Sequence, residues 1–194
     1  MNPLKTSAFI SPTNEFIYKN ASYSFNLQIA SLISKKIQKN LKKYELWKKI
    51  PLLEKDKNTI NLAESSINDF ISFCQCQIID ITDENVIDLN YLSKEYEIAQ
   101  LKDITDQYIK SDDKILLKLY VFNLNVDQLN NEIYEEAISQ RLTEFINNDD
   151  LLNLPIFSMH RILEKNDNLN DHDKFNFLLK CLKKIWQKCI NFIS

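Results

Sequence analysis

Four cysteines and two histidines are the side chains best suited to chemistry in this 194-residue sequence. Cys74 and Cys76 form a Cys-x-Cys pair, which would supply half of the thiolates that a structural zinc ion needs. Further ligands with suitable spacing are missing nearby, and Cys181 and Cys189 fit the buried apolar stripe of a helix. The simplest interpretation is free thiols, so we expect no metal and no cofactor. Cysteine-dependent metal or redox chemistry is the alternative.

The two histidines are the candidates for acid–base chemistry. His172 lies between Asp171 and Asp173, but the same residues suit a helix N-terminus, where Asp171 caps the helix and Asp173 complements its dipole. His160 is followed by Arg161 and has no partner that can be identified in the sequence. Nothing marks a nucleophile with its base, so the sequence predicts that the chain is not an enzyme.

The complete absence of glycine narrows the range of activities further. A chain of this length would contain roughly 14 glycines at average usage, and it contains none. Phosphate-cradling loops, dinucleotide-binding turns and the nucleophile elbow of hydrolases need residues that allow close backbone approach or positive φ. Most nucleotide-binding enzymes and many hydrolases are therefore excluded. Asparagine is expected to take over where the chain turns left-handed.

Charge is distributed unevenly, although the formal net charge is only −3. Residues 35–57 carry nine lysines against three acids, or +6, and residues 80–113 carry ten acids against three lysines, or −7. A lysine-rich segment that contains Tyr44 and Trp47 could contact nucleic acid phosphates. This segment has no arginine, and its apolar residues recur every third or fourth position, which is typical of a solvated helix face. Nucleic acid binding is therefore the less favoured alternative.

Length and composition predict a folded, soluble protein. The chain is 44% hydrophobic and 11% aromatic, enough to bury a core. The N-terminus has no apolar run of the kind found in secretory signals, and no stretch approaches the ~20 apolar residues that cross a bilayer. We expect a cytoplasmic protein, with the nucleus as the alternative, and no contact with a membrane.

Hydrophobic spacing predicts mixed strand and helix before residue 110. Residues 16–26 are expected to form two short strands around a turn that contains Asn20. A helix with apolar residues three or four apart follows and is stopped by Pro51. The other expected elements are short strands at 58–64 and 78–81, and helices that begin near Ser65, after a cap at Thr82 or Asp83, and around Ile98.

Helix alone is expected from residue 112 onward. Asn125 and Gln128 have the spacing of a capping box, and Pro155 suits the first turn of a helix that contains Leu151, Leu154, Ile162 and Leu163. The cleanest pattern is the apolar stripe of the last helix, which comprises Phe175, Leu178, Leu182, Ile185, Cys189 and Ile193. The predicted domains are therefore 15–111 and 112–194.

The order of these elements resembles a BTB (POZ) domain. The segment FIYKNASYSFNLQIASLISKKI (16–37) is similar to that family's opening hairpin and first helix, and residues 67–109 are similar to its second half. Residues 131–182 resemble the helical BACK extension that often follows. The resemblance implies an α+β BTB/POZ fold with an all-α, BACK-like extension. The sequence departs from the family at Asn26, where many members have histidine, and in FCQCQ (73–77).

The resemblance implies a protein–protein interaction module. Many BTB adaptors of cullin-type ubiquitin ligases carry a hydrophobic-x-Glu tripeptide before the mid-domain strand, and LLE, with Leu52 and Glu54, lies in roughly that place. An exposed Leu52 would fill a partner's apolar pocket while Glu54 fixes orientation. The expected partners are proteins: a cullin, other BTB proteins, or a second copy of the chain in self-association. Many BTB domains exchange an N-terminal segment between subunits when they dimerise, and the corresponding segment before residue 15 is short here.

Overall fold

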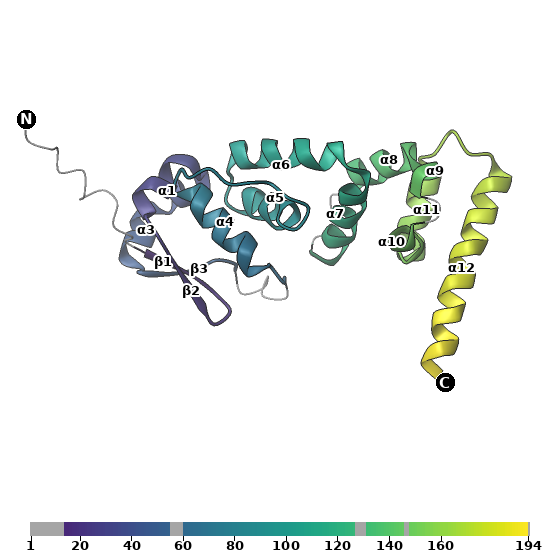
Figure 1. Ribbon diagram of the computed structural model, residues 1–194, viewed down its shortest axis with the longest axis horizontal. Helices are drawn as coiled ribbons and strands as arrows, with labels where there is room; N and C mark the ends of the chain where they lie inside the picture. Colours follow the sequence, from purple (N-terminus) through teal and green to yellow (C-terminus); the bar gives the residue numbers. More distant parts are fainter. Residues whose placement is uncertain (1–13, 55–59, 127–130, 146–147, 194) are drawn as a thin grey trace, which may run out of the picture. The chain divides into compact units, whose positions relative to one another are not determined.

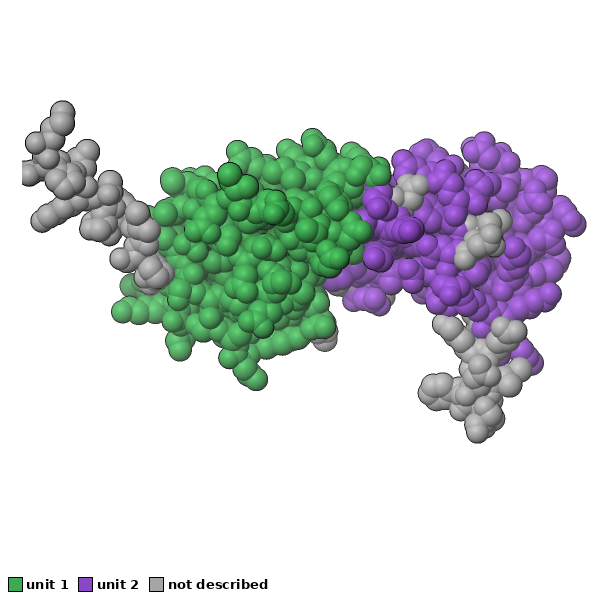
Figure 2. All heavy atoms as spheres, viewed as in Figure 1, with its two compact units in different colours: residues 1–111 green, residues 112–194 purple. Residues whose placement is uncertain are grey.

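The computed structural model describes residues 14–54, 60–126, 131–145 and 148–193. The chain divides into two compact units, unit 1 (Met1–Ser111) and unit 2 (Asp112–Ser194), drawn in green and purple in Figure 2. Unit 1 combines a small sheet with helices, and the described part of unit 2 is helical (Figure 1). The units divide at the position where the sequence pattern changes to helix alone. Among the described residues, no helix is long and apolar enough to span a membrane.

A three-stranded sheet forms the base of unit 1. Strand β1 (Asn14–Tyr18) lies in the middle, antiparallel to β2 (Ala21–Phe25) and parallel to β3 (Lys49–Pro51). The predicted hairpin is confirmed, but Lys19, with φ of 52°, takes the left-handed position of its turn instead of Asn20. Side chains alternate between buried and half-buried along β1, as expected for a strand with one face on the core.

Six helices complete the described part of unit 1: α1 (Leu27–Ile33), α2 (Lys35–Lys39), α3 (Leu41–Leu46), α4 (Glu64–Cys74), α5 (Val86–Glu95) and α6 (Ala99–Ser111). The prediction of one continuous helix before Pro51 is wrong, because the chain breaks it at Ser34 and Asn40. Ser34 has extended backbone angles, and its hydroxyl accepts a hydrogen bond from the N–H of Ile37, which starts a new helix. The spacing of apolar residues alone does not predict such a break in a helix.

Two of the short strands predicted in unit 1 are wrong. Residues 60–63 have no regular structure, and residues 58–59 lie outside the described part of the chain. Residues 78–81 are irregular as well. The cap of α5 is Asn85, whose side-chain oxygen accepts from the N–H of Thr82, and neither Thr82 nor Asp83 holds that position. A short apolar run becomes a strand only where a sheet edge is available to pair with it.

Aromatic side chains form the centre of the unit 1 core. The Phe16 and Phe25 rings stack with centroids 4.0 Å apart, across the β1–β2 hairpin. The ring of Tyr96, at the end of α5, packs edge-on against Phe16 with centroids 5.4 Å apart, and it is tilted against Phe70 of α4 with centroids 5.1 Å apart. The sheet, α4 and α5 are thereby joined through one cluster of fully buried rings.

Unit 2 contains α7 (Asp113–Val126), α8 (Glu132–Gln140), α9 (Leu142–Phe145), α10 (Asp149–Leu152), α11 (Ile156–Glu164) and α12 (Asp171–Ile193). The predicted capping box is wrong, because Asn125 lies inside α7, and Gln128 lies outside the described residues. Pro155 caps α11, so the pattern predicted as one helix across residues 151–163 divides into α10 and α11.

The last helix forms as predicted, but its buried side is not the expected stripe. Among the described side chains of α12, Phe177 and Cys181 are buried, whereas Phe175 and Leu182, which belong to the expected stripe, are exposed. Cys181 is thus buried as expected, and the side chain of Cys189 lies outside the described part of the chain. Spacing of apolar residues shows that a helix is amphipathic, but a helix with two apolar faces leaves open which one packs.

Candidate partner-binding surface

Tyr96 connects three segments of unit 1. Its hydroxyl donates to the carbonyl oxygen of Leu52 at 2.7 Å, and its own carbonyl oxygen accepts from the Ser34 hydroxyl at 2.7 Å. Burial raises the pKa of Tyr96 well above its ordinary value, so the hydroxyl stays protonated and remains a donor. The end of α5, the start of α2 and the residues after β3 are therefore fixed to one another.

The expected exposure of Leu52 is wrong, because this side chain is only 1% exposed. The backbone N–H of Leu52 donates to the carbonyl oxygen of Ile17 at 2.8 Å, which extends the β1–β3 pairing and turns the side chain into the core. A buried leucine cannot fill a partner's pocket. Glu54, two residues further, is mostly exposed, with its carboxylate 3.5 Å from the Lys36 ammonium.

Ion pairs join the lysine-rich segment to the acidic segment. The Lys36 ammonium pairs with Glu95 and lies 5.3 Å from the centre of the Tyr96 ring. Lys39 pairs with Glu97 at 2.7 Å, and Glu97 has a φ of 53°, which ends α5. Part of the positive charge of residues 35–57 is thus neutralised within the fold. The exposed Lys39–Glu97 pair contributes at most about 1 kcal/mol to stability, so its main consequence is the charge pattern of the surface.

An exposed apolar pair lies at the end of α3. Leu46 is 85% exposed and Trp47 is 44% exposed. The Trp47 ring is covered on one side by the Lys43 ammonium, 4.5 Å from its centre. Asn14 donates from its side-chain nitrogen to the carbonyl oxygens of Tyr44, at 2.9 Å, and Trp47, at 2.7 Å. The backbone under the pair is therefore held to the first strand.

Tyr44 links the apolar pair to the charged residues. Its ring lies 6.4 Å from that of Trp47. Burial raises the pKa of Tyr44, the charge of Lys36 lowers it, and the charges of Glu54 and Glu95 raise it again, so these groups lie within electrostatic range. The combined set is called the α2–α3 surface and comprises Lys36, Lys39, Lys43, Leu46, Trp47, Glu54, Glu95 and Glu97.

The Leu46–Trp47 pair was missed in the sequence, although a signal was present. Leu46 follows Tyr44 by two positions, so it falls off the stripe of apolar residues three and four apart. A large apolar residue off the stripe points to solvent when its helix packs on one side.

A polar hollow of about 430 Å³ lies elsewhere on unit 1, lined by Ser65, Asp69, Ser72, Gln77, Ile78, Ile79, Asp80, Thr82, Glu84 and Asn85. The Asn85 amide nitrogen donates to the Asp69 carboxylate at 2.8 Å and to the carbonyl oxygen of Asp80 at 2.9 Å. The Asn85 side chain thus uses its hydrogen-bonding groups to fix the residue 80–85 loop.

Three of the four cysteines, Cys74, Cys76 and Cys181, lie in the described part of the chain and are free thiols. Cys74 is buried, which raises the pKa of its thiol, and Cys76, with φ of 59°, is exposed. Burial also raises the pKa of Cys181, to about 11. The two buried thiols are therefore protonated near neutral pH and are poor nucleophiles. Within the described residues no group of three or more His, Cys, Asp or Glu side chains could hold a metal ion.

The histidines lie on exposed helix surfaces. His160 Nδ1 is 3.4 Å from the Glu164 carboxylate, one turn along α11. His172 is exposed in the first turn of α12. The predicted cap at Asp171 is wrong, because the side-chain oxygen of Asn170 accepts from the N–H of Asp173 at 2.9 Å and takes the capping role.

A buried carboxylate organises unit 2. Glu135 of α8 is buried and accepts hydrogen bonds from Arg161 at 2.6 Å, Lys165 at 3.2 Å and the Tyr120 hydroxyl at 3.1 Å. Burial alone would raise the pKa of Glu135, but these donors outweigh it and hold the pKa below its ordinary value. The side chain remains charged and connects α7, α8 and α11. Sequence reasoning noted Arg161 without finding this partner.

No protein-family model matches the chain, and a search of curated proteins finds no match. The resemblance to BTB and BACK domains therefore stays a prediction.

Proposed function

We propose that the chain is a protein–protein interaction module and that the α2–α3 surface contacts its partner. The observation that carries this proposal is the exposed Leu46–Trp47 pair on a backbone fixed by Asn14. Binding energy in protein interfaces concentrates in a few anchors, among which tryptophan is prominent, and surrounding charges select the partner and its orientation. Lys43 lies over the Trp47 ring, and Tyr44, whose ring neighbours that of Trp47, is within electrostatic range of Lys36, Glu54 and Glu95.

The sharpest form of the proposal is a BTB–BACK adaptor that recruits a cullin-type ubiquitin ligase. It draws on the resemblance of residues 16–37 and 67–109 to BTB domains, with Glu54 as the member of the LLE tripeptide that reaches solvent. Leu46 and Trp47 replace Leu52 as the apolar anchors. No catalysis is assigned to the chain, and its work in this proposal is recognition.

A direct binding measurement tests the proposal. The purified full chain is immobilised and titrated with the purified N-terminal region of a cullin. We expect binding by the wild type and at least a tenfold loss in Trp47→Ala/Glu54→Lys, since removal of an anchor costs about 2 kcal/mol or more. The matched control is Ile104→Ala/Asp103→Lys, which makes the same kinds of change at exposed residues of α6 and should bind like the wild type.

Circular dichroism of each variant shows that the fold is intact. The adaptor form would be wrong if the wild type did not bind a cullin. Equal binding by the wild type and Trp47→Ala/Glu54→Lys would remove the α2–α3 surface from the contact. If affinity purification from native cytosol recovers copies of the chain or other BTB proteins but no cullin, we would assign an assembly module.

Nucleic acid binding is the second candidate, since Lys35, Lys42, Lys48 and Lys49 are exposed in the same segment as Trp47. Their positive charge favours a phosphate backbone, and an exposed aromatic ring can stack on bases. Lys36 and Lys39 pair with glutamates, so residues 35–57 present less positive charge to a partner than their sequence alone suggests. A steep fall in affinity for single-stranded RNA between 50 and 200 mM salt would support this candidate. The absence of binding at low salt would remove it.

A further inference from the structure

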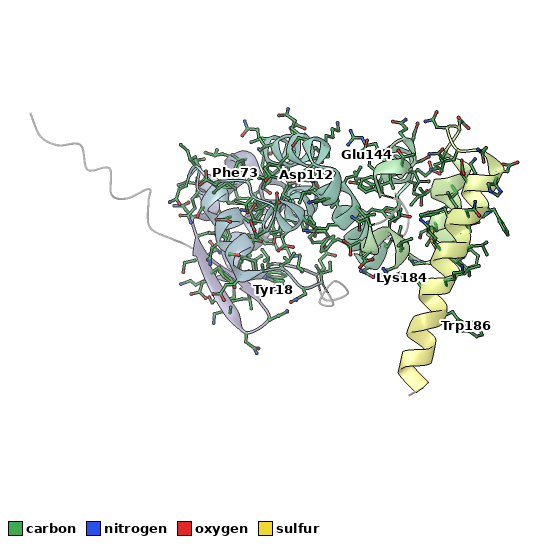
Figure 3. All side chains as sticks on the ribbon, turned by 45° about the vertical axis from the view of Figure 1, so that its right-hand side comes forward. Tyr18, Phe73, Asp112, Glu144, Lys184 and Trp186 are labelled. Atoms are coloured by element: carbon green, nitrogen blue, oxygen red, sulfur yellow. The ribbon has the colours of Figure 1, made fainter. Side chains whose placement is uncertain are left out.

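The last helix exposes a continuous apolar stripe. Phe175 is 58% exposed, Leu179 37%, Leu182 50% and Trp186 71%. Successive members are four, three and four residues apart, which places them on one line along the helix and equals the a/d spacing of a coiled coil. Trp186 extends outward from α12 (Figure 3). These four residues are called the α12 stripe.

The stripe lies on the side of α12 that faces away from the core of its unit. Phe177 and Cys181, which are buried, point in nearly the opposite direction at about 100° per residue. Lys184, close to this inner side, pairs with Asp149 of α10. One face thus holds α12 to unit 2 and the other is available. The helix has 23 residues and continues past the neighbouring helices of its unit (Figure 1).

The exposed area of the stripe is large for a monomer. Two aromatic and two leucine side chains at these exposures present on the order of 500 Å² of apolar surface. Monomeric proteins rarely expose a contiguous apolar patch of more than a few hundred Å². Two such stripes, pressed together with their flanking side chains, would bury roughly 1,000 Å² or more, which reaches the lower range of specific interfaces.

The stripe is complementary to itself when two helices run antiparallel. With the two-fold axis between positions 180 and 181, Phe175 faces Trp186 of a second copy, and Leu179 faces Leu182. Large residues then meet at the ends and smaller ones at the centre. Every contact occurs twice, as an isologous interface requires.

Charge favours the antiparallel arrangement over the parallel one. Asp171 and Asp173 lie in the first turn of α12. Parallel helices would bring the two acidic first turns side by side, which is destabilising. Antiparallel helices place these turns at opposite ends of the contact, and they also oppose the helix dipoles.

We propose that two copies of this chain associate through an antiparallel pairing of their α12 stripes. The contact lies in unit 2, so it adds a second association site to the one assigned to unit 1. This self-association names one partner for the proposed interaction module. It rests on the proposed function only in that both assign protein binding to the chain. Loss of the α12 contact would leave binding through the α2–α3 surface in place.

Sedimentation velocity tests the proposal. The full chain is measured between about 1 and 200 μM, a concentration range suited to an interface near the lower size limit. We expect a reversible monomer–dimer equilibrium in this range. Leu182→Glu places two carboxylates at the centre of the apolar contact and should raise the dissociation constant at least tenfold. Phe157→Glu is the matched control, because Phe157 is also exposed in unit 2 but lies on α11, and it should leave the constant unchanged within twofold.

Trp186 supplies an independent readout. In a Trp47→Phe background it is the only tryptophan, and its emission should shift to shorter wavelength as the concentration rises and the stripe becomes buried. Phe175→Cys and Trp186→Cys test the orientation, because these two positions face each other only in the antiparallel dimer. Mixed under mild oxidation, the two single variants should form a disulfide between position 175 of one copy and position 186 of the other, identified by peptide mapping. A disulfide that joins position 175 to position 175 in its place would overturn the antiparallel arrangement.

Two results would overturn self-association through the α12 stripe. One is a chain that stays monomeric at every concentration. If that monomeric wild type co-sedimented with anionic lipid vesicles and Leu182→Glu did not, the stripe would bind a lipid surface and not a second copy. The other is a dimer that Leu182→Glu leaves intact. Cullin binding by Leu182→Glu, measured in parallel, separates these results from a failure of the function proposed for unit 1.

Discussion

Unit 1 and unit 2 place different polar groups at the centre of their packing. In unit 1 the central group is the neutral Tyr96 hydroxyl, which donates to the backbone carbonyl of Leu52. In unit 2 it is the charged carboxylate of Glu135, held by Arg161 and Lys165. The contribution of a neutral hydrogen bond to stability changes little with pH, whereas the contribution of a buried charge depends on its partners and on pH. The two units should therefore respond differently to mutation and to acid.

Removal of the Glu135 carboxylate should have the largest effect. Glu135→Ala leaves Arg161, Lys165 and the Tyr120 hydroxyl without their shared acceptor, and we expect unit 2 to lose about 3 kcal/mol of stability. Hydrogen exchange measured by mass spectrometry on peptides of α8 and α11 reports this loss separately from unit 1. Glu136→Ala, at the exposed neighbouring position, should change exchange little. Equal effects of the two substitutions would mean that the buried network does not stabilise unit 2.

Removal of the Tyr96 hydroxyl should have an intermediate effect, confined to unit 1. Tyr96→Phe keeps the buried ring and leaves the Leu52 carbonyl oxygen without its donor, at a cost of about 1–2 kcal/mol. Exchange in β3 and α5 should accelerate while unit 2 is unchanged. Tyr108→Phe is the control, because the Tyr108 hydroxyl bonds to Asp83 at the surface. If the control destabilised unit 1 as strongly, the burial of the hydrogen bond would not be the cause.

A fall in pH should change the stability of the two units in opposite directions. The pKa of Glu135 is lowered in the folded chain, so its stabilisation is present above the ordinary value of 4.5 and is lost as the pH falls below it. Burial raises the pKa of Asp88 in unit 1 above its ordinary 3.8, so protonation of Asp88 favours the folded state as the pH falls.

Urea titrations followed by hydrogen exchange at pH 7, 5 and 4 measure both trends. Glu135→Gln should weaken the acid loss in unit 2, and Asp88→Asn should remove its contribution in unit 1. If both units lost stability equally in acid, and neither substitution altered that loss, Glu135 and Asp88 would not be the groups responsible.

The smallest effect is expected at the surface ion pairs. Lys39→Ala breaks the exposed pair with Glu97 and should change the stability of unit 1 by no more than about 0.5 kcal/mol. A thermal melt of the variant beside the wild type detects a larger change. A substantial loss would show that the pairing of the basic and acidic segments stabilises the fold as well as shaping its surface charge.

Local sequence patterns predicted the parts of the fold that depend on neighbouring residues. The hairpin at residues 16–26, helices α5 and α6, and the helical second half follow from period and composition, which act along the chain. The failed strands at 58–64 and 78–81 depend on a pairing edge that no local pattern reveals. The break at Ser34 depends on a hydrogen bond from its hydroxyl to the carbonyl of Tyr96, far along the chain.

The candidate surface divides in the same way. The sequence alone determined that residues 35–57 are basic, that residues 80–113 are acidic, and that phosphate-cradling glycine loops are absent, because these are properties of composition. Only the tertiary structure decided that Leu52 is buried, that Leu46 and Trp47 are exposed, and that lysines of one segment pair with glutamates of the other. Burial and pairing depend on which elements pack together, and a helix with apolar residues on two faces, such as α12, gains its inner and outer sides only when it meets its neighbours.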